Sequence, residues 1–137
     1  LFGHPLGGLT MLDSFLDDRA VAFTKRGERY QQFTYGRFTV DLFLPTADTW
    51  GSIFTIRTGS WEFSRWLVTP QAIGGALPDG LVARDGRLLA HGRLLLTPEE
   101  TDVFAALGLA WIPPIERFGP IADPLRIEPI WNYEQGE

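Results

Sequence analysis

Asp41 is the residue whose type and position most strongly indicate chemistry. It lies in the middle of an apolar run, residues 38–44, that has the character of a strand. Because side chains alternate between the two faces of a strand, Asp41 shares its face with Thr39 and Phe43. Burying a carboxylate without a partner is costly. Two interpretations stay open: Asp41 faces a metal, a cation or a cleft, or it is a solvent-facing residue of an edge strand.

The other ionisable residues that we considered give weaker signals. Asp17 and Asp18 are adjacent, so on a strand their side chains would diverge, and we expect them to cap or end a short helix at residues 11–16. His4 and His91 have no second histidine or cysteine at ligand spacing, and we expect both to be solvent-exposed. The absence of cysteine excludes disulfides, Cys-ligated zinc and thiol catalysis.

Composition and charge narrow the classes of function. The chain is 45% hydrophobic and 21% charged, as in ordinary globular proteins. Its net charge of −5 argues mildly against a standalone nucleic-acid binder, although the twelve basic residues can still gather on one face. No apolar run reaches the roughly 20 residues that span a bilayer, and the first residues do not resemble a signal peptide. We expect a cytoplasmic protein with no membrane partner; the oligomeric state is left open.

Short strands and short helices must position these residues. Two apolar runs around Tyr35-Gly36 predict a hairpin, with Asp41 on its second strand. Residues 50–57 are β-branched and aromatic and predict another strand, which the turn at residues 58–60 ends. Residues 61–67 follow as a helix. The five tryptophans could stack on bases, but packing within the core is expected for most of them.

The second half of the chain has the clearest start and stop signals. Asp85-Gly86 predicts a hairpin between residues 81–84 and 87–89, to which residues 94–96 can add a strand. A helix is expected next, on the evidence of Thr97 as N-cap, Pro98 in the first turn, Glu100 completing a capping box and Gly108 as the stop. The proline-spaced end of the chain predicts an extended tail.

Several of these pieces, taken in order, resemble the C-terminal part of family-X (polymerase beta-like) DNA polymerases. That family has an Asp in an apolar strand followed by Pro and a Trp-Gly or similar pair, a Thr-Gly-Ser turn before a Phe-containing helix, an acidic capped helix, and then Ile-Pro-Pro and Glu-Arg. The matching residues here are 40–45, Trp50-Gly51, Thr58-Gly59-Ser60 with Phe63, 103–109, 111–114 and Glu116-Arg117. No single piece is specific to the family. The order of the pieces over about 80 residues, 38–118, is specific. The short, phage-type nucleotidyltransferases are closest in character.

The resemblance implies an α+β fold and a domain organisation. Residues 1–57 would be the C-terminal part of a nucleotidyltransferase palm sheet, and residues 58–118 a small thumb of helix, short antiparallel sheet and helix. Residues 119–137 would be an extended tail. The implied reaction is two-metal nucleotidyl transfer with Mg²⁺ (or Mn²⁺), from a nucleoside triphosphate to the 3′ end of a DNA primer-template.

The same resemblance implies a role for Asp41. The family holds its metals with three carboxylates, and Asp41 matches the third, a ligand of the catalytic metal. The other two lie on an earlier strand, after a Gly-Ser turn, in an Asp-x-Asp pattern that does not precede Asp41 here. We expect that strand upstream of Leu1, and we expect the 137-residue chain alone to be inactive.

Nucleotide contacts are implied around the turn. In the family, Thr58-Gly59-Ser60 would join palm to thumb, with unusual backbone geometry, in the extreme a cis peptide, near the nucleotide sugar. The plainer alternative, compatible with this, is a turn with Ser60 as helix N-cap. Arg57 would meet the triphosphate, or be a surface arginine, and Ser64 matches a position that often contacts the base.

Departures from the family pattern keep other functions open. Ile56-Arg57 replaces an aromatic pair that rejects ribonucleotides, and Thr39 replaces a basic residue, so sugar choice and template dependence do not carry over. One rival is a nucleotidyltransferase that acts on a small molecule or a protein. The other is a non-catalytic, thumb-like binding module. An upstream Asp-x-Asp strand favours an enzyme, and a basic groove on the thumb favours a polymerase.

Overall fold

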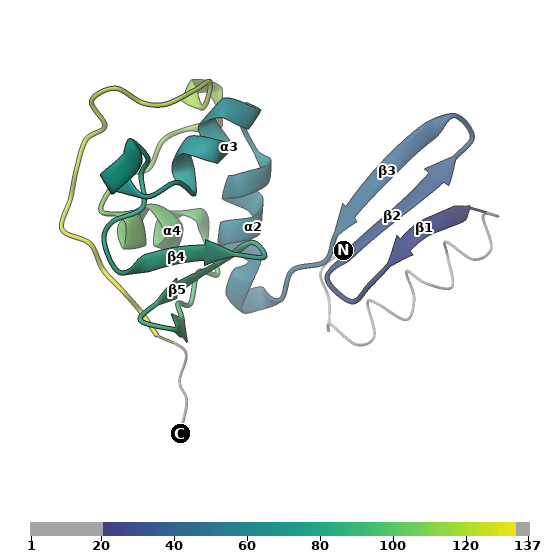
Figure 1. The fold of residues 1–137 in the computed structure, drawn as a ribbon, viewed down its shortest axis with the longest axis horizontal. Helices are drawn as coiled ribbons and strands as arrows, with labels where there is room; N and C mark the ends of the chain where they lie inside the picture. Colours follow the sequence, from purple (N-terminus) through teal and green to yellow (C-terminus); the bar gives the residue numbers. More distant parts are fainter. Residues whose placement is uncertain (1–20, 134–137) are drawn as a thin grey trace. The chain divides into compact units, whose positions relative to one another are not determined.

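The computed structural model describes residues 21–133 of the chain (Figure 1). The fold is α+β, as predicted: the described residues form two three-stranded antiparallel sheets and three α-helices. The chain divides into two compact units; the first ends at Thr46 and the second begins at Ala47. Each unit is described by itself. The helix expected at residues 11–16, together with His4, Asp17 and Asp18, lies outside the described residues.

The first unit is an antiparallel sheet in the order β1-β2-β3. Its strands are β1 (Ala22–Arg26), β2 (Tyr30–Tyr35) and β3 (Phe38–Phe43). The predicted hairpin is confirmed, but its tip is Gly36-Arg37, one residue later than expected, because Tyr35 pairs with Phe38. Gly36 has a φ of 61°, which glycine adopts without a steric cost.

The second unit holds the three helices and the second sheet. The helices are α2 (Trp50–Arg57), α3 (Trp61–Leu67) and α4 (Glu100–Leu107), and three short 3-10 turns lie at Ala47–Thr49, Gln71–Ile73 and Pro114–Glu116. The sheet consists of β4 (Leu81–Arg84), β5 (Arg87–Ala90) and β6 (Arg93–Leu94), with the predicted turn at Asp85-Gly86. One apolar core joins these elements, with Phe63, Leu67, Leu88, Phe104 and Leu107 almost fully buried.

Residues 50–57 form helix α2, so the strand predicted there is wrong. The buried face of the helix consists of small residues, Gly51, Ser52 and Thr55, and not of its large apolar ones. The Gly51 amide donates to the carbonyl of Thr97 at 2.7 Å, and a Cβ at Gly51 would lie only 2.2 Å from the carbonyl oxygen of Glu99. This close approach to the start of α4 fixes the helix, and tertiary packing overrides the β propensity of the segment.

Helix α4 begins later than the sequence predicts. Its N-cap is Glu99, which forms a capping box with Asp102, so the predicted box of Thr97 and Glu100 is wrong. Thr97 is buried, and its amide donates to the carbonyl of Asp48 at 2.8 Å. Thr97 lies two residues before the N-cap and ties the chain to the residues before α2. Gly108 ends α4 with a φ of 73°, as predicted.

The C-terminal segment runs along α4 and completes the second unit (Figure 1). The last carbonyls of a helix have no partner within it. Here the amide of Ile130 donates to the carbonyl of Ala105 at 2.9 Å, and the indole of Trp131 donates to that of Ala106 at 2.9 Å. The extended tail expected from the prolines therefore supplies the donors that the end of α4 needs.

Candidate functional site

The residues that the sequence singles out fall into two groups. Asp41 belongs to the first unit, while Arg57, the turn at residues 58–60 and Ser64 belong to the second. The two groups therefore belong to different units of the chain.

Asp41 lies on β3, at the edge of the first sheet, opposite Gln32 on β2, and it is exposed. Its Oδ1 accepts a hydrogen bond from the Tyr30 hydroxyl at 2.6 Å and another from Gln32 Nε2 at 2.9 Å. The Oε1 of Gln32 in turn accepts one from the Thr24 hydroxyl at 2.8 Å. We call Thr24, Tyr30, Gln32 and Asp41 the Asp41 cluster. Its side chains come from three adjacent strands, and neutral donors hold one oxygen of an exposed carboxylate.

The Asp41 cluster combines the two interpretations that the sequence left open. The strand is an edge strand and the carboxylate is exposed, yet it also has partners within the sheet. A carboxylate whose one oxygen is fixed by hydrogen bonds is a suitable hard ligand for a divalent cation.

The fit to the implied metals is partial. Within residues 21–133, no three histidine, aspartate or glutamate side chains gather as metal ligands. The donors beside Asp41 are neutral and occupy its Oδ1. This part of the chain therefore offers one carboxylate ligand for Mg²⁺ or Mn²⁺ and does not complete a two-metal site by itself.

The turn from Thr58 to Ser60 joins α2 to α3. Gly59 has a φ of 111°, a conformation that side chains rarely allow, so the predicted unusual backbone is present. The peptide bonds of the described residues are all trans, so the predicted extreme form, a cis peptide, is wrong. Ser60 is the N-cap of α3, since its Oγ accepts the Phe63 amide at 3.1 Å, as expected.

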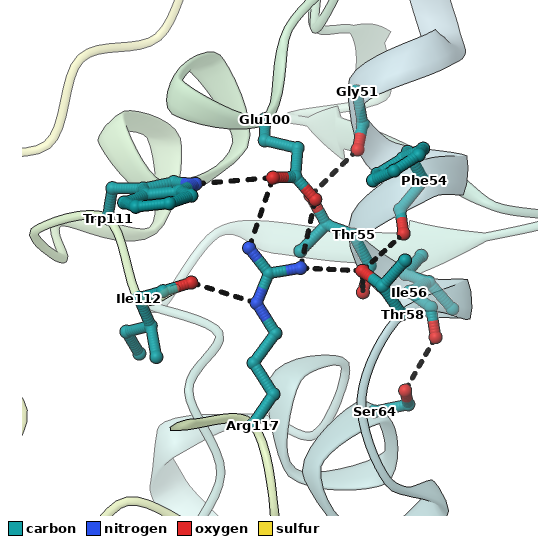
Figure 2. Close-up of polar contacts among 10 residues, drawn as sticks. All are labelled: Gly51, Phe54, Thr55, Ile56, Thr58, Ser64, Glu100, Trp111, Ile112 and Arg117. Atoms are coloured by element: carbon teal, nitrogen blue, oxygen red, sulfur yellow. Dashed lines mark hydrogen bonds and ion pairs between the residues drawn. The ribbon is translucent and has the colours of Figure 1, made fainter. Parts of the chain in front are cut away.

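A buried arginine lies beside this turn (Figure 2). Arg117 is fully buried, and its guanidinium forms a two-pronged pair with Glu100, with distances of 2.9 Å from Nη1 to Oε2 and 3.1 Å from Nη2 to Oε1. Its Nη1 also donates to the Thr58 hydroxyl at 2.6 Å, and its Nε donates to the carbonyl of Ile112 at 2.9 Å. We call Arg117, Glu100, Thr58, Ile112 and Trp111 the Arg117 cluster.

Glu100 is held by more than its arginine. The Trp111 indole donates to Oε1 at 3.2 Å, and the Thr55 hydroxyl lies 3.5 Å from Oε2 (Figure 2). Burial raises the pKa of Glu100, but hydrogen bonds from Arg117 and Trp111, with the positive charge of Arg117, outweigh burial and bring the pKa below its ordinary value. The glutamate therefore stays ionised and keeps the buried guanidinium neutralised.

Arg117 also contacts the backbone of the turn. Its carbonyl accepts the Ser60 amide at 2.7 Å, and a Cβ at Gly59 would lie 2.6 Å from the Cβ of Arg117. The turn, the first residue of α4 and the residue after the third 3-10 turn thus meet at one place. Sequence reasoning quoted Arg117 only as part of a motif and gave Glu100 only a capping role. The order of the motifs was the available signal, because charge pattern does not mark a buried arginine.

The remaining predicted contacts lie close to the turn. The Ser64 hydroxyl donates to the carbonyl of Ile56 at 2.5 Å, so it ties α3 to the end of α2. Arg57 is the last residue of α2 and is exposed. Trp61, in the first turn of α3, is 68% exposed, with the Arg65 guanidinium 5.3 Å from its ring centroid. His91 is exposed, as expected.

No protein-family model matches this chain, and no curated protein matches it. The likeness to family-X polymerases therefore stays a prediction from the order of the sequence motifs. No helix of the described segment is long and apolar enough to cross a membrane.

Proposed function

We propose that this chain is the C-terminal part of a nucleotidyltransferase of the family-X DNA polymerase kind, working within a longer protein. The observation that supports the proposal best is the meeting of the Thr58-Gly59-Ser60 turn, Glu100 and Arg117 in the second unit. These residues are far apart in the sequence: the turn and Arg117 belong to two of the pieces that resemble the family, and Glu100 begins the helix that carries a third.

In this proposal Asp41 supplies the third carboxylate of the metal site. Tyr30 and Gln32 orient its Oδ1 through hydrogen bonds of 2.6 and 2.9 Å. The Mg²⁺ (or Mn²⁺) ions, when bound, would stabilise the charge that develops on the reacting phosphate. The two further carboxylates would come from a palm strand outside the described residues, so we do not assign Asp41 a complete site here.

The second unit would supply the nucleotide contacts. The Thr58–Ser60 turn would bring its backbone to the sugar, and Gly59 allows this turn because a side chain there would meet Arg117. Arg57, exposed at the end of α2, would meet the triphosphate. Ser64 could reach a base only by giving up its bond to the Ile56 carbonyl, so it is the weakest of these assignments. A DNA primer-template is the proposed partner, and the cytoplasm the proposed location.

The experiment compares Asp41→Asn with wild type in a form of the protein that includes the upstream palm strand. Nucleotide incorporation into a primer-template with Mg²⁺ should be abolished by Asp41→Asn, because a lost metal ligand removes several kcal/mol of transition-state stabilisation. The matched control is Asp123→Asn, an exposed aspartate of the tail, which should retain activity. The 137-residue chain alone should show no incorporation with either metal.

Two results would count against this function. Retention of more than about a tenth of the activity in Asp41→Asn would mean a loss below roughly 1.4 kcal/mol, too little for a metal ligand. Incorporation by the 137-residue chain alone would contradict the need for upstream carboxylates. Activity towards a small molecule or a protein but not towards a primer would favour the rival acceptor, with which the net charge of −5 agrees.

A further inference from the structure

Arg117 forms hydrogen bonds with the turn on both sides of Gly59. Before the glycine, its guanidinium donates to the Thr58 hydroxyl at 2.6 Å; after it, its carbonyl accepts the Ser60 amide at 2.7 Å. Gly59 itself lies so close to Arg117 that a Cβ would come within 2.6 Å of the arginine Cβ. A single residue thus contacts all three residues of the turn.

The guanidinium is fixed in turn by its other partners. Glu100 holds both terminal nitrogens, and the carbonyl of Ile112 accepts from Nε (Figure 2). The planar fork of an arginine defines direction in a way that a lysine cannot. Buried pairs of this kind are weak evidence for stability, since packed apolar residues often serve as well, and in some proteins they specify geometry instead.

We infer that Arg117 is a positioning residue: held by Glu100, it sets the backbone of the Thr58–Ser60 turn for the nucleotide. Gly59 gives this turn freedom that other residues would not have, and its φ of 111° is kept by the contacts on either side. The part of the inference that concerns the nucleotide rests on the proposed function. The part that concerns the turn rests on the hydrogen bonds alone, so the two can fail separately.

A merely stabilising role makes a different prediction. If the Arg117 cluster served stability only, weakening it would raise hydrogen exchange throughout the second unit, because exchange would follow global unfolding. If Arg117 positions the turn, loss of its bond to Thr58 should loosen the turn and leave the sheet protected. The Ser60 amide, bound to the Arg117 carbonyl, reports on the turn, and the Leu95 amide, bound to Leu88, reports on the core.

The test is amide exchange by NMR on the 137-residue chain, comparing Thr58→Val with Thr58→Ser. Valine removes the hydroxyl but keeps the shape, and serine restores the acceptor for Arg117. We expect exchange of the Ser60 amide to rise about tenfold or more in Thr58→Val, as for the loss of a hydrogen bond to a charged group. It should stay near wild type in Thr58→Ser. Equal changes at Ser60 and Leu95, or no change at Ser60, would overturn the inference.

A second variant separates Arg117 from the other partner of Thr58. The Thr58 hydroxyl also donates to the carbonyl of Phe54 at 2.7 Å, and Thr58→Val removes that bond too. Arg117→Lys leaves it in place and keeps the charge, yet should also raise exchange at Ser60 more than at Leu95. If Arg117→Lys leaves Ser60 as protected as in wild type, the turn is held from α2 and the inference is wrong.

The nucleotide part is tested in the same samples. The amide signals of residues 58–60 are followed while dATP and Mg²⁺ are added. Signals that shift in wild type, with an apparent Kd that rises in Thr58→Val and recovers in Thr58→Ser, support positioning for the nucleotide. An apparent Kd that does not change between them overturns that part. Signals that do not shift in wild type count against the proposed role of the turn, while the exchange data still decide whether Arg117 positions it.

Discussion

The Asp41 cluster and the Arg117 cluster differ in where their charged groups lie and in what binds them. In the Asp41 cluster an exposed carboxylate accepts hydrogen bonds from the neutral side chains of Tyr30 and Gln32. In the Arg117 cluster a fully buried cation meets a carboxylate that is itself only 17% exposed. The first charge lies at the exposed face of its sheet, where solvent reaches it. A charge neutralised in the interior acts on the protein's own backbone, here on the turn before α3.

The largest expected effect tests whether the Arg117 cluster contributes more to stability than the Asp41 cluster does. Arg117→Ala should lower the free energy of unfolding by about 3–5 kcal/mol, because it removes a fully buried group and leaves Glu100, which is only 17% exposed, without its cation. Asp41→Asn should change it by less than about 0.5 kcal/mol, as expected for an exposed site. Urea unfolding of the two variants measures both. Similar losses in the two would remove the contrast between the clusters.

The sequence predicts the elements that depend on nearby residues and not those that depend on distant ones. The strand around Asp41 and the helix at residues 61–67 could be predicted, because alternation and helical spacing depend on nearby residues. The same pattern also allowed the interpretation that Asp41 faces solvent. Helix α2 could not be predicted, since its buried face is Gly51, Ser52 and Thr55, and its position depends on carbonyls more than 40 residues away. A pattern of large apolar residues cannot reveal a helix that packs through small ones.

The partners of the two charges were also beyond local reasoning. Gln32 lies opposite Asp41 through strand register, which an accurate hairpin tip would have given. Arg117 meets Glu100 and Thr58 across 17 and 59 residues, and no spacing rule joins these positions. The family resemblance, which includes both Thr58-Gly59-Ser60 and Glu116-Arg117, is the link between these positions in the sequence.

A smaller effect, in pH dependence, sharpens the description of the buried cluster. The pKa of Glu100 is lowered in the folded protein, so its contribution to stability is complete above its ordinary value of 4.5 and is lost as the pH falls through the folded value. The difference in unfolding free energy between wild type and Glu100→Gln should therefore shrink between about pH 5 and pH 3. Urea titrations at a series of pH values measure it, and a difference that stays constant or grows would contradict this assignment.

A variant of Tyr30 should have a small effect on stability, and it tests whether the exposed cluster serves a ligand. Tyr30→Phe removes the hydroxyl that donates to Asp41 at 2.6 Å and keeps the ring packed on Phe43, with centroids 5.1 Å apart. Stability should fall by no more than about 1 kcal/mol, the usual net value of one exposed hydrogen bond. If Asp41 is a metal ligand, losing a group that orients it should weaken metal binding about 10- to 100-fold.

The measurement for Tyr30 is made in a form of the protein that includes the upstream palm strand. Mn²⁺ binding is followed by electron paramagnetic resonance, together with the Mg²⁺ concentration that gives half-maximal activity. Tyr35→Phe is the matched control, because Tyr35 lies on the same strand at the hairpin tip and is 54% exposed. Weaker metal binding in Tyr30→Phe alone would tie the cluster to a cation. Equal binding in both variants would leave Tyr30 as a surface hydrogen bond of the sheet, and the orienting role proposed for it would be wrong.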